Sequence, residues 1–222
     1  MMNEPRGIIR LSVRVGQTLL LGTKLQVLFI LFTLRGGLVL GLFPALATCT
    51  KVILRRLAAK PADAGALFGD PRDTWPALYQ EFRQFYRQSF WEVNGIGYLG
   101  VLAVVVLVID LAVNAAFLRS APLQYGLIVL LILVLSYWLY VLTIYGRYNL
   151  RFWQYFRQAL IISVARFTNT LAIIVGSVLA TVLLVIFPAL SLIALVPLYL
   201  APTVWFSYQS CLHVEAVLHY AA

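Results

Sequence analysis

The segment from Thr33 to Lys51 reads "TLRGGLVLGLFPALATCTK", and it decides how the chain is organised. It is apolar enough to lie in a membrane, yet it contains Arg35, three glycines and Pro44. A central arginine costs about 2.5–3.5 kcal/mol on membrane-insertion scales. Glycine and proline also disfavour the interior of a continuous helix. One unbroken spanning helix is therefore a poor description of this segment.

Composition places the whole chain in a membrane. Its 222 residues are 62% hydrophobic and 11% charged, whereas a soluble domain is about 45–50% apolar and about 25% charged. A soluble protein of this size cannot cover so much apolar surface, so lipid is part of its solvent. The sequence predicts an all-α, polytopic transmembrane helix bundle. Residues 1–222 form one integral membrane domain, with about five to six membrane segments plus amphipathic interfacial helices.

Four later spans follow from length, since a crossing needs about 20 mainly apolar residues. The run from Thr170 to Phe206 carries no charge and is too long for one crossing, so Pro188 is the expected break. Short joining loops are typical of antiparallel helix pairs. The predicted spans are residues 94–117, 123–145, 169–187 and 190–212.

Two interpretations of residues 25–58 stay open. In one, Gln26 to Thr48 crosses once, with Arg35 in the middle. In the other, a helix over about residues 10–34 is followed by a turn through "RGGLVLGLFP", and a second helix returns from Ala45 to Ala58. Glycines then supply the turn, and Pro44 stands at the first helical position, where its missing N–H is harmless. We favour this hairpin, which can be re-entrant where protein or water covers it.

The amino-terminal region, residues 1–24, has regularly spaced arginines. Arg6, Arg10 and Arg14 recur at helical spacing beside an apolar face, as in a helix that lies in the headgroup layer. One interpretation is an anchor only. The other is a docking helix for another protein.

Loop charge predicts the orientation. Seven Lys or Arg lie between Lys51 and Glu92, and four Arg lie between Arg147 and Arg166. The opposite loops carry only Arg119. By the positive-inside rule both basic loops and the carboxyl terminus are cytoplasmic. The net charge of +9 therefore favours anionic headgroups over nucleic acid as the partner.

Residues 59–92 form the long cytoplasmic connection. Its first half is rich in Gly, Pro and Asp, which predicts a loop. Its second half, "ALYQEFRQFYRQSFWEV", reads as a helix with Phe82, Tyr86 and Phe90 on one face. Aromatic side chains favour the membrane interface, so we expect this face to be a second docking surface.

Two stretches resemble the YesL family of bacterial membrane proteins. The first is "LFTLRGGLVLGLFPALATCTKVILRRL" with its Gly-x-x-Pro-Ala turn (Gly41, Pro44, Ala45), followed by the aromatic helix of "FRQFYRQSFWEVNGIGYLG". The second is "YNLRFWQYFRQALIISVARFTNTL". Arg35 departs from the apolar residue expected there. The resemblance implies a multi-pass protein of the bacterial cytoplasmic (inner) membrane, with genes for carbohydrate import and degradation often adjacent; it implies no defined activity.

Motifs for chemistry are missing from the sequence. It has no phosphate-binding Gly-Lys-Ser/Thr loop and no HExxH. Cys49 and Cys211 stand apart in apolar runs, which favours buried hydrophobes over a metal site or disulfide. His213, Glu215 and His219 share one helix end but no common face. We therefore expect no catalytic residues, no cofactor and no metal.

Intramembrane polar groups are the remaining binding or structural candidates. Asp110 and Asn114 stand four apart and share a helix face. Asp110 pairs with Arg35 inside the bundle in one interpretation. In the other, Asp110 meets headgroup water and Arg35 reaches the outer surface at the hairpin turn.

The function predicted first is a non-catalytic accessory or scaffold subunit linked to carbohydrate import, with the permease and ATPase subunits of an ABC-type transporter as partners. The alternative is a small oligomeric transporter or channel that acts on its own by self-association. A membrane enzyme acting on lipid or glycan is disfavoured by the absence of catalytic motifs.

Overall fold

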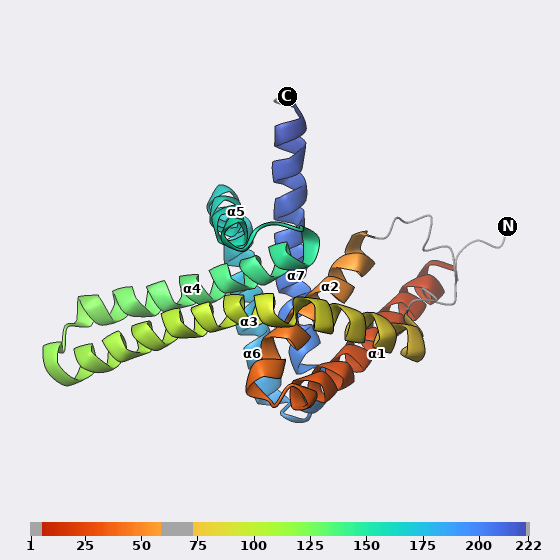
Figure 1. Cartoon of the computed structure of the whole chain (residues 1–222), viewed down its shortest axis with the longest axis horizontal. Helices are drawn as coiled ribbons and strands as arrows, with labels where there is room; N and C mark the ends of the chain where they lie inside the picture. The colour runs from red at the N-terminus through yellow and green to blue at the C-terminus, as the bar shows by residue number, and fades with distance from the viewer. Residues whose placement is uncertain (1–5, 59–72, 221–222) are drawn as a thin grey trace.

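The computed structural model describes the backbone of residues 6–58 and 73–220, and the side chains of residues 16–58 and 73–215. This part of the chain is helical, with no strand (Figure 1). A single π-helical turn, Asn114–Leu118, extends the third helix. The helices are α1 (Arg6–Arg35), α2 (Val39–Ala58), α3 (Trp75–Val113), α4 (Ala121–Arg147), α5 (Phe152–Ala165), α6 (Phe167–Ile186) and α7 (Ala189–Tyr220).

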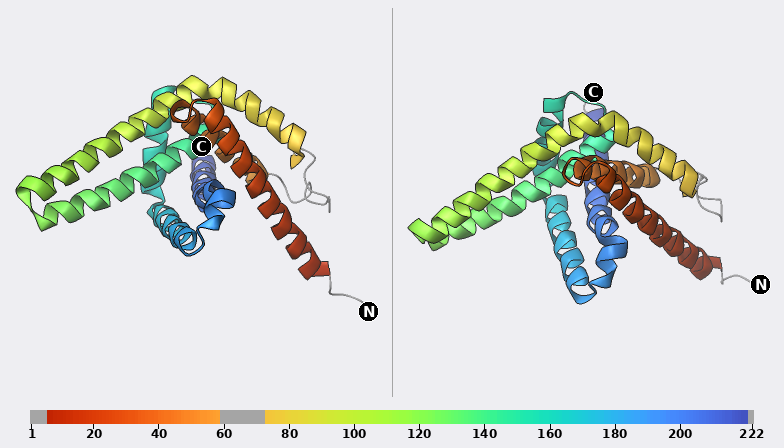
Figure 2. Two further views of the ribbon diagram at one scale, coloured as in Figure 1. Left: turned by 90° about the horizontal axis from the view of Figure 1, so that it is seen from below. Right: turned by 60° about the horizontal axis from the view of Figure 1, so that its bottom comes forward.

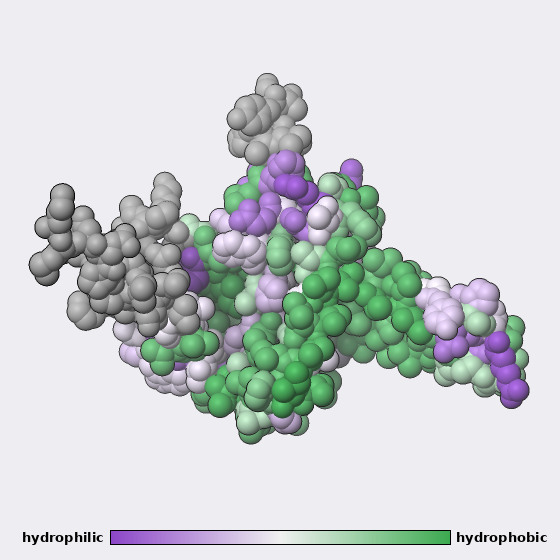
Figure 3. All heavy atoms as spheres, turned by 180° about the vertical axis from the view of Figure 1, so that it is seen from behind, coloured by the Kyte–Doolittle hydropathy of each residue, from purple (hydrophilic) through white to green (hydrophobic). Residues whose placement is uncertain are grey.

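Five of these helices are long and apolar enough to cross a membrane. Apolar side chains dominate their outer surfaces, and polar residues gather at the top of the molecule and at the tip of the α3–α4 hairpin (Figure 3). The chain is a multi-pass, all-α membrane protein, as the sequence predicts. The candidate spans are Gly16–Arg35, Trp75–Leu118, Ala121–Arg147, Phe167–Ile186 and Ala189–Glu215.

The segment Thr33–Lys51 contains the turn of a helical hairpin between α1 and α2. The structure therefore agrees with the two-helix interpretation. The α1 helix ends in a Schellman motif: Leu38 N–H donates to Thr33 O at 2.9 Å, and Gly37 N–H donates to Leu34 O at 3.1 Å. Gly37 and Leu38 have φ angles of 76° and 62°. A left-handed pair of residues therefore reverses the chain within residues 36–38.

The predicted place of Pro44 is wrong. The α2 helix begins at Val39, so Pro44 lies inside it and not at its first position. The turn is shorter than expected because Gly36 and Gly41 let two backbones meet: a Cβ on Gly36 would lie 2.4 Å from Gly41 Cα. Pro44 has no N–H to donate to the preceding turn, and its own carbonyl accepts the Thr48 hydroxyl at 2.6 Å.

The α2 helix stands at the centre of the fold, in contact with α1, α3, α4 and α7. Two apolar clusters meet at it. One joins α1, α2, the start of α3 and α7, and its largest fully buried side chains are Phe32 and Phe82. The other joins α2, through Ala47, to α3, α4, α5, α6 and α7 around Tyr140 and Tyr155.

The α3 helix runs from the predicted aromatic helix into the predicted span without a break. Its distal half pairs with α4 in a long hairpin that projects from the rest of the molecule in every view (Figures 1 and 2). Only the base of this arm packs on the body. There Gly97 accommodates the Phe43 ring, and Gly100 accommodates the Trp138 ring.

The α6 and α7 helices form the other hairpin, and its break at residues 187–188 confirms the prediction from Pro188. Two prolines, Pro197 and Pro202, lie inside α7. Proline interrupts the helical hydrogen-bond ladder, and neighbouring side chains then satisfy freed backbone groups. The Gln26 side chain of α1 does this, since its Oε1 accepts the Val196 N–H at 3.0 Å.

We predict that Gly41→Ala destabilises the protein strongly. A Cβ on Gly41 would lie 2.4 Å from Thr33 O and 2.9 Å from Phe32 O, and these backbone atoms cannot move without opening the hairpin. Overpacking costs about 1–3 kcal/mol or more. Thermal unfolding in detergent measures the loss. Gly126→Ala is the control, because nothing lies within 4 Å of its added Cβ. Equal midpoints for the two variants would contradict the close approach.

Candidate functional site

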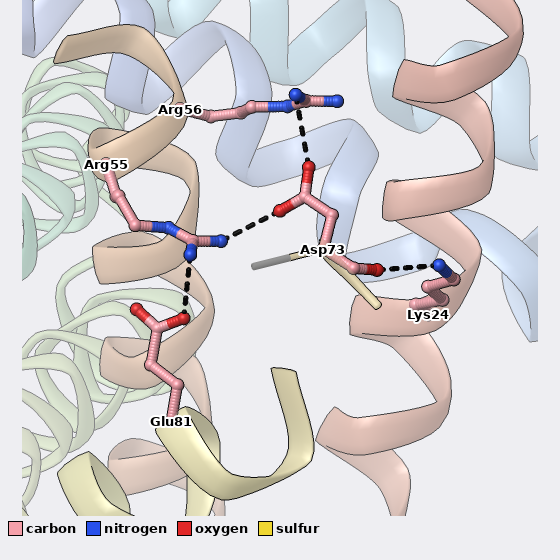
Figure 4. A network of polar contacts seen from close by, with 5 residues as sticks. All are labelled: Lys24, Arg55, Arg56, Asp73 and Glu81. Carbon is pink, nitrogen blue, oxygen red and sulfur yellow. Dashed lines mark hydrogen bonds and ion pairs between the residues drawn. The ribbon is translucent and has the colours of Figure 1, made fainter. Parts of the chain in front are cut away.

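A network of charges joins the end of α2, the start of α3 and the middle of α1 (Figure 4). The Asp73 carboxylate accepts from Arg55 at 2.8 Å and lies 3.1 Å from Arg56. Arg55 also contacts Glu81 at 3.0 Å, and Lys24 Nζ donates to the Asp73 main-chain carbonyl at 2.7 Å. The two acids thus hold two arginines of α2, and the Asp73 main chain holds Lys24 of α1.

Lys51 lies on α2, four residues before Arg55. Its Nζ is 3.7 Å from the centre of the Phe85 ring. Burial lowers the pKa of the Lys51 ammonium, and the Glu81 carboxylate acts against that shift. The face of the Phe85 ring attracts the Lys51 ammonium through a cation–π contact. Lys51 therefore does not need a second carboxylate as a partner. The basic end of α2 is therefore anchored by packing as well as by ion pairs.

A second charged contact ties the hairpins together. Arg147, at the end of α4, donates to both oxygens of Glu215 on α7, at 3.0 and 2.7 Å. The Tyr148 hydroxyl also donates to Glu215, and the Arg147 guanidinium lies 4.7 Å from the Tyr208 ring centre. Burial and the hydrogen bond to Glu215 raise the pKa of Tyr148. Both carboxylate oxygens of Glu215 are therefore bonded to the end of α4.

A polar cluster lies between α4, α6 and α7. The Asn169 amide donates to Ser210 Oγ at 2.8 Å and to Phe206 O at 3.3 Å. The Tyr140 hydroxyl lies 3.4 Å from both Ser210 Oγ and Thr170 Oγ1. Tyr140 and Ser210 are fully buried. These groups satisfy one another, which is how polar residues join helices in a membrane.

The structure does not bring Arg35 and Asp110 together, so the interpretation in which they pair inside the bundle is wrong. Arg35 ends α1 and lies close enough to the Tyr86 hydroxyl to act on it electrostatically. Asp110 stands about 36 Å farther along α3 than Tyr86, at about 1.5 Å per residue. Both side chains are exposed. The α3 helix carries Asp110 away into the projecting arm.

Asn114 has a structural role at the arm tip. Its amide donates to Ser120 O at 3.1 Å, and its Oδ1 accepts the Ser120 N–H at 3.2 Å. Its carbonyl also accepts the Arg119 N–H at 2.7 Å, where φ is 48°. This buried side chain closes the turn between α3 and α4. It shares no partner with Asp110.

The predicted docking face of the aromatic helix is wrong. Phe82 and Tyr86 are buried, and their ring centres lie 4.9 and 5.1 Å from that of Phe32 on α1. Phe90 is partly buried beside Tyr86. The face belongs to the core because α1 covers it. The turn-motif residues Gly41, Pro44 and Ala45 are likewise buried in the hairpin and are structural.

The free face of this helix is polar and basic. We name it the basic stripe, and it leads to Trp91, whose side chain is 80% exposed. From the sequence, Arg83 and Arg87 are expected beside the aromatic face of this helix, but no role is predicted for them. The stripe consists of Gln80, Arg83, Gln84, Arg87 and Gln88.

The α5 helix repeats this arrangement. It buries Tyr155, Ala159 and Ile162 and exposes Arg157 together with Trp153, which is 71% exposed. Phe152, at its start, packs beside α3, where a Cβ on Gly95 would lie 3.4 Å from the ring. Both amphipathic helices thus expose arginine and tryptophan side chains.

The other predicted residues have simpler outcomes. Arg6, Arg10 and Arg14 belong to α1, but their side chains and that of His219 lie outside the described residues. Cys49 and Cys211 are buried and unpaired by disulfide. Within the described residues, no three His, Cys, Asp or Glu side chains are grouped to hold a metal ion.

Comparison with known proteins gives no relative: no family model, no curated protein and no solved structure matches this chain.

We predict that Asp73→Ala destabilises the protein more than Glu81→Ala. Asp73 is 12% exposed and serves two arginines, whereas Glu81 is 31% exposed and serves one. Removing this partly buried carboxylate leaves Arg56 without its ion pair and Arg55 with Glu81 alone, at a cost of about 1–3 kcal/mol. An exposed single pair contributes about 0–1 kcal/mol. Thermal unfolding in detergent at low salt measures both. An equal or reversed order would show that Asp73 does not organise the network.

Proposed function

We propose that this protein is a non-catalytic accessory or scaffold subunit of a membrane transport complex, and that its basic stripe is the docking surface. The observation that carries the proposal is the exposure of Arg83 and Arg87 on a helix whose other face is fixed in the core. Cations on a rigid helix face favour an acidic partner surface. The resemblance to the YesL family supports a carbohydrate importer of the ABC type as that complex.

The interior chemistry supports a scaffold over an enzyme. The hydroxyls and amide of the α4–α6–α7 cluster are bonded to one another. Asp73 and Glu215 are held by arginines. An acid or base for catalysis has to reach a substrate proton, and these groups are engaged inside the protein. Their arrangement favours holding helices in place.

The proposed location is the bacterial cytoplasmic membrane, with both basic loops and the carboxyl terminus on the cytoplasmic side. The positive-inside rule supports this orientation. The exposed Trp91 and Trp153 support it as well, because tryptophan is enriched at membrane–water interfaces. Both stand near cations of the basic loops. The basic stripe then faces the cytoplasm, where the ATPase subunit of an importer lies.

The alternative is a small oligomeric transporter or channel, and one observation favours it. Asn94 is 3% exposed, and neither polar atom of its amide has a hydrogen-bond partner among the described residues. Polar groups at membrane depth often mark the path of a solute or ion. Asn94 would then be part of that path.

Copurification tests the scaffold proposal. Affinity purification of the tagged, full-length chain from its native membrane should recover the permease and ATPase subunits of one importer. The Arg83→Glu, Arg87→Glu double variant should recover about tenfold less, because two attractions become repulsions. Mass spectrometry with labelled standards measures the recovery.

Arg119→Glu provides the matched control, since it reverses one exposed arginine at the arm tip, away from the stripe. It should recover the importer as the wild type does. Recovery of the chain without importer subunits, together with solute movement by the purified chain in liposomes, would overturn the scaffold proposal. Loss of that movement in Asn94→Leu would then favour the alternative.

A further inference from the structure

Arg35 stands in an exposed apolar patch at the tip of the α1–α2 hairpin. We name this the arginine patch; its members are Arg35, Leu31, Leu34, Leu38 and Val39, all exposed. No ion pair of Arg35 occurs among the described residues, and its one identified electrostatic neighbour is the neutral phenol of Tyr86. The patch is therefore apolar with one unpaired positive charge.

Asp110 stands in a patch of the opposite sign. It lies on the outer face of the α3–α4 arm, and the residues three, four and seven positions away on that face include exposed Val106, Val113 and Phe117. The described residues offer Asp110 no cation. We name this group the aspartate patch: Val106, Ile109, Asp110, Val113 and Phe117.

The two patches cannot meet within one chain. The α3–α4 arm projects away from the α1–α2 hairpin (Figures 1 and 2), and Asp110 lies in the last turn of α3. The distance along α3 is about 36 Å from the Tyr86 level to Asp110, at about 1.5 Å per residue. An arginine side chain does not bridge such a distance. Pairing therefore requires a second molecule.

We propose that two copies of this chain associate through these patches, so that Asp110 of each copy pairs with Arg35 of the other. Each patch joins an apolar rim to one central charge, and the charges are opposite. A two-fold axis makes both pairs at once, because such an interface uses the same surfaces on both subunits. An unrelated partner would have to supply both complements, whereas a second copy already has them.

The association also explains the isolated arm. Its outward face is exposed along its length, from Leu102 to Leu118, and a second copy covers part of that face. Charges exposed to hydrocarbon are unfavourable, and they occur in membranes mainly as pairs or beside water. The proposal does not rest on the importer link, since it concerns the purified chain alone.

Cysteine cross-linking tests the contact without disturbing charge elsewhere. Two differently tagged full-length chains, one with Arg35→Cys and one with Asp110→Cys, are co-expressed in a background with Cys49→Ala and Cys211→Ala. A short bis-maleimide is then added to membranes. A band that carries both tags is expected. The control pair replaces Asp110→Cys by Gln124→Cys, at an exposed position near the arm tip, and should cross-link at least about fivefold less.

Charge exchange provides the second measurement. In detergent, Asp110→Arg and Arg35→Asp should each weaken dimerisation about tenfold or more, and the double exchange should restore it. Sedimentation across a concentration series measures the dimer fraction. A monomeric wild-type chain in membranes and detergent, with no doubly tagged band, overturns the proposal. So does a double exchange that melts like the wild type yet stays monomeric.

Discussion

The approach of Gly36 to Gly41 sets the course of α2, and the other helices pack according to that course. Two backbones touch at this point, so α1 and α2 leave the turn close together. The α2 helix then passes through the centre of the molecule, in contact with α1, α3, α4 and α7. A wider turn would displace α2 and separate the two apolar clusters that meet on it. Backbone proximity, and not side-chain chemistry, is thus the primary constraint.

A membrane adds the requirement that backbone groups be satisfied inside the protein. Prolines within α2 and α7 remove N–H donors. Near the α7 prolines, Gln26 crosses from α1 to bind the Val196 N–H. Near Pro44, the Thr48 hydroxyl of the same helix donates to the proline carbonyl. The Gln26 contact satisfies a backbone donor of α7 and also fixes α1 against α7.

The spans were predictable from sequence, because hydrophobic length and the break at Pro188 are local properties. The hairpin at residues 36–38 was predictable in kind from its glycines. Its length was not, since the contact of Gly36 with Gly41 depends on how two helices pack. Local sequence also could not show whether the aromatic face of this helix is buried or exposed. Phe82 and Tyr86 define a face, but only the position of Phe32 on α1 decides that this face is the core.

Two groups of charges in this protein differ in their surroundings. Asp73 and Glu215 lie at helix ends with arginines and a lysine or tyrosines around them, so their electrostatics are complete within one chain. Arg35 and Asp110 lie among exposed apolar side chains and have no ion pair among the described residues. Packing explains the first group and cannot explain the second. Arg35 and Asp110 are opposite in sign and each lies on an apolar surface, and this complementarity supports the proposal that a second copy of the chain completes both contacts.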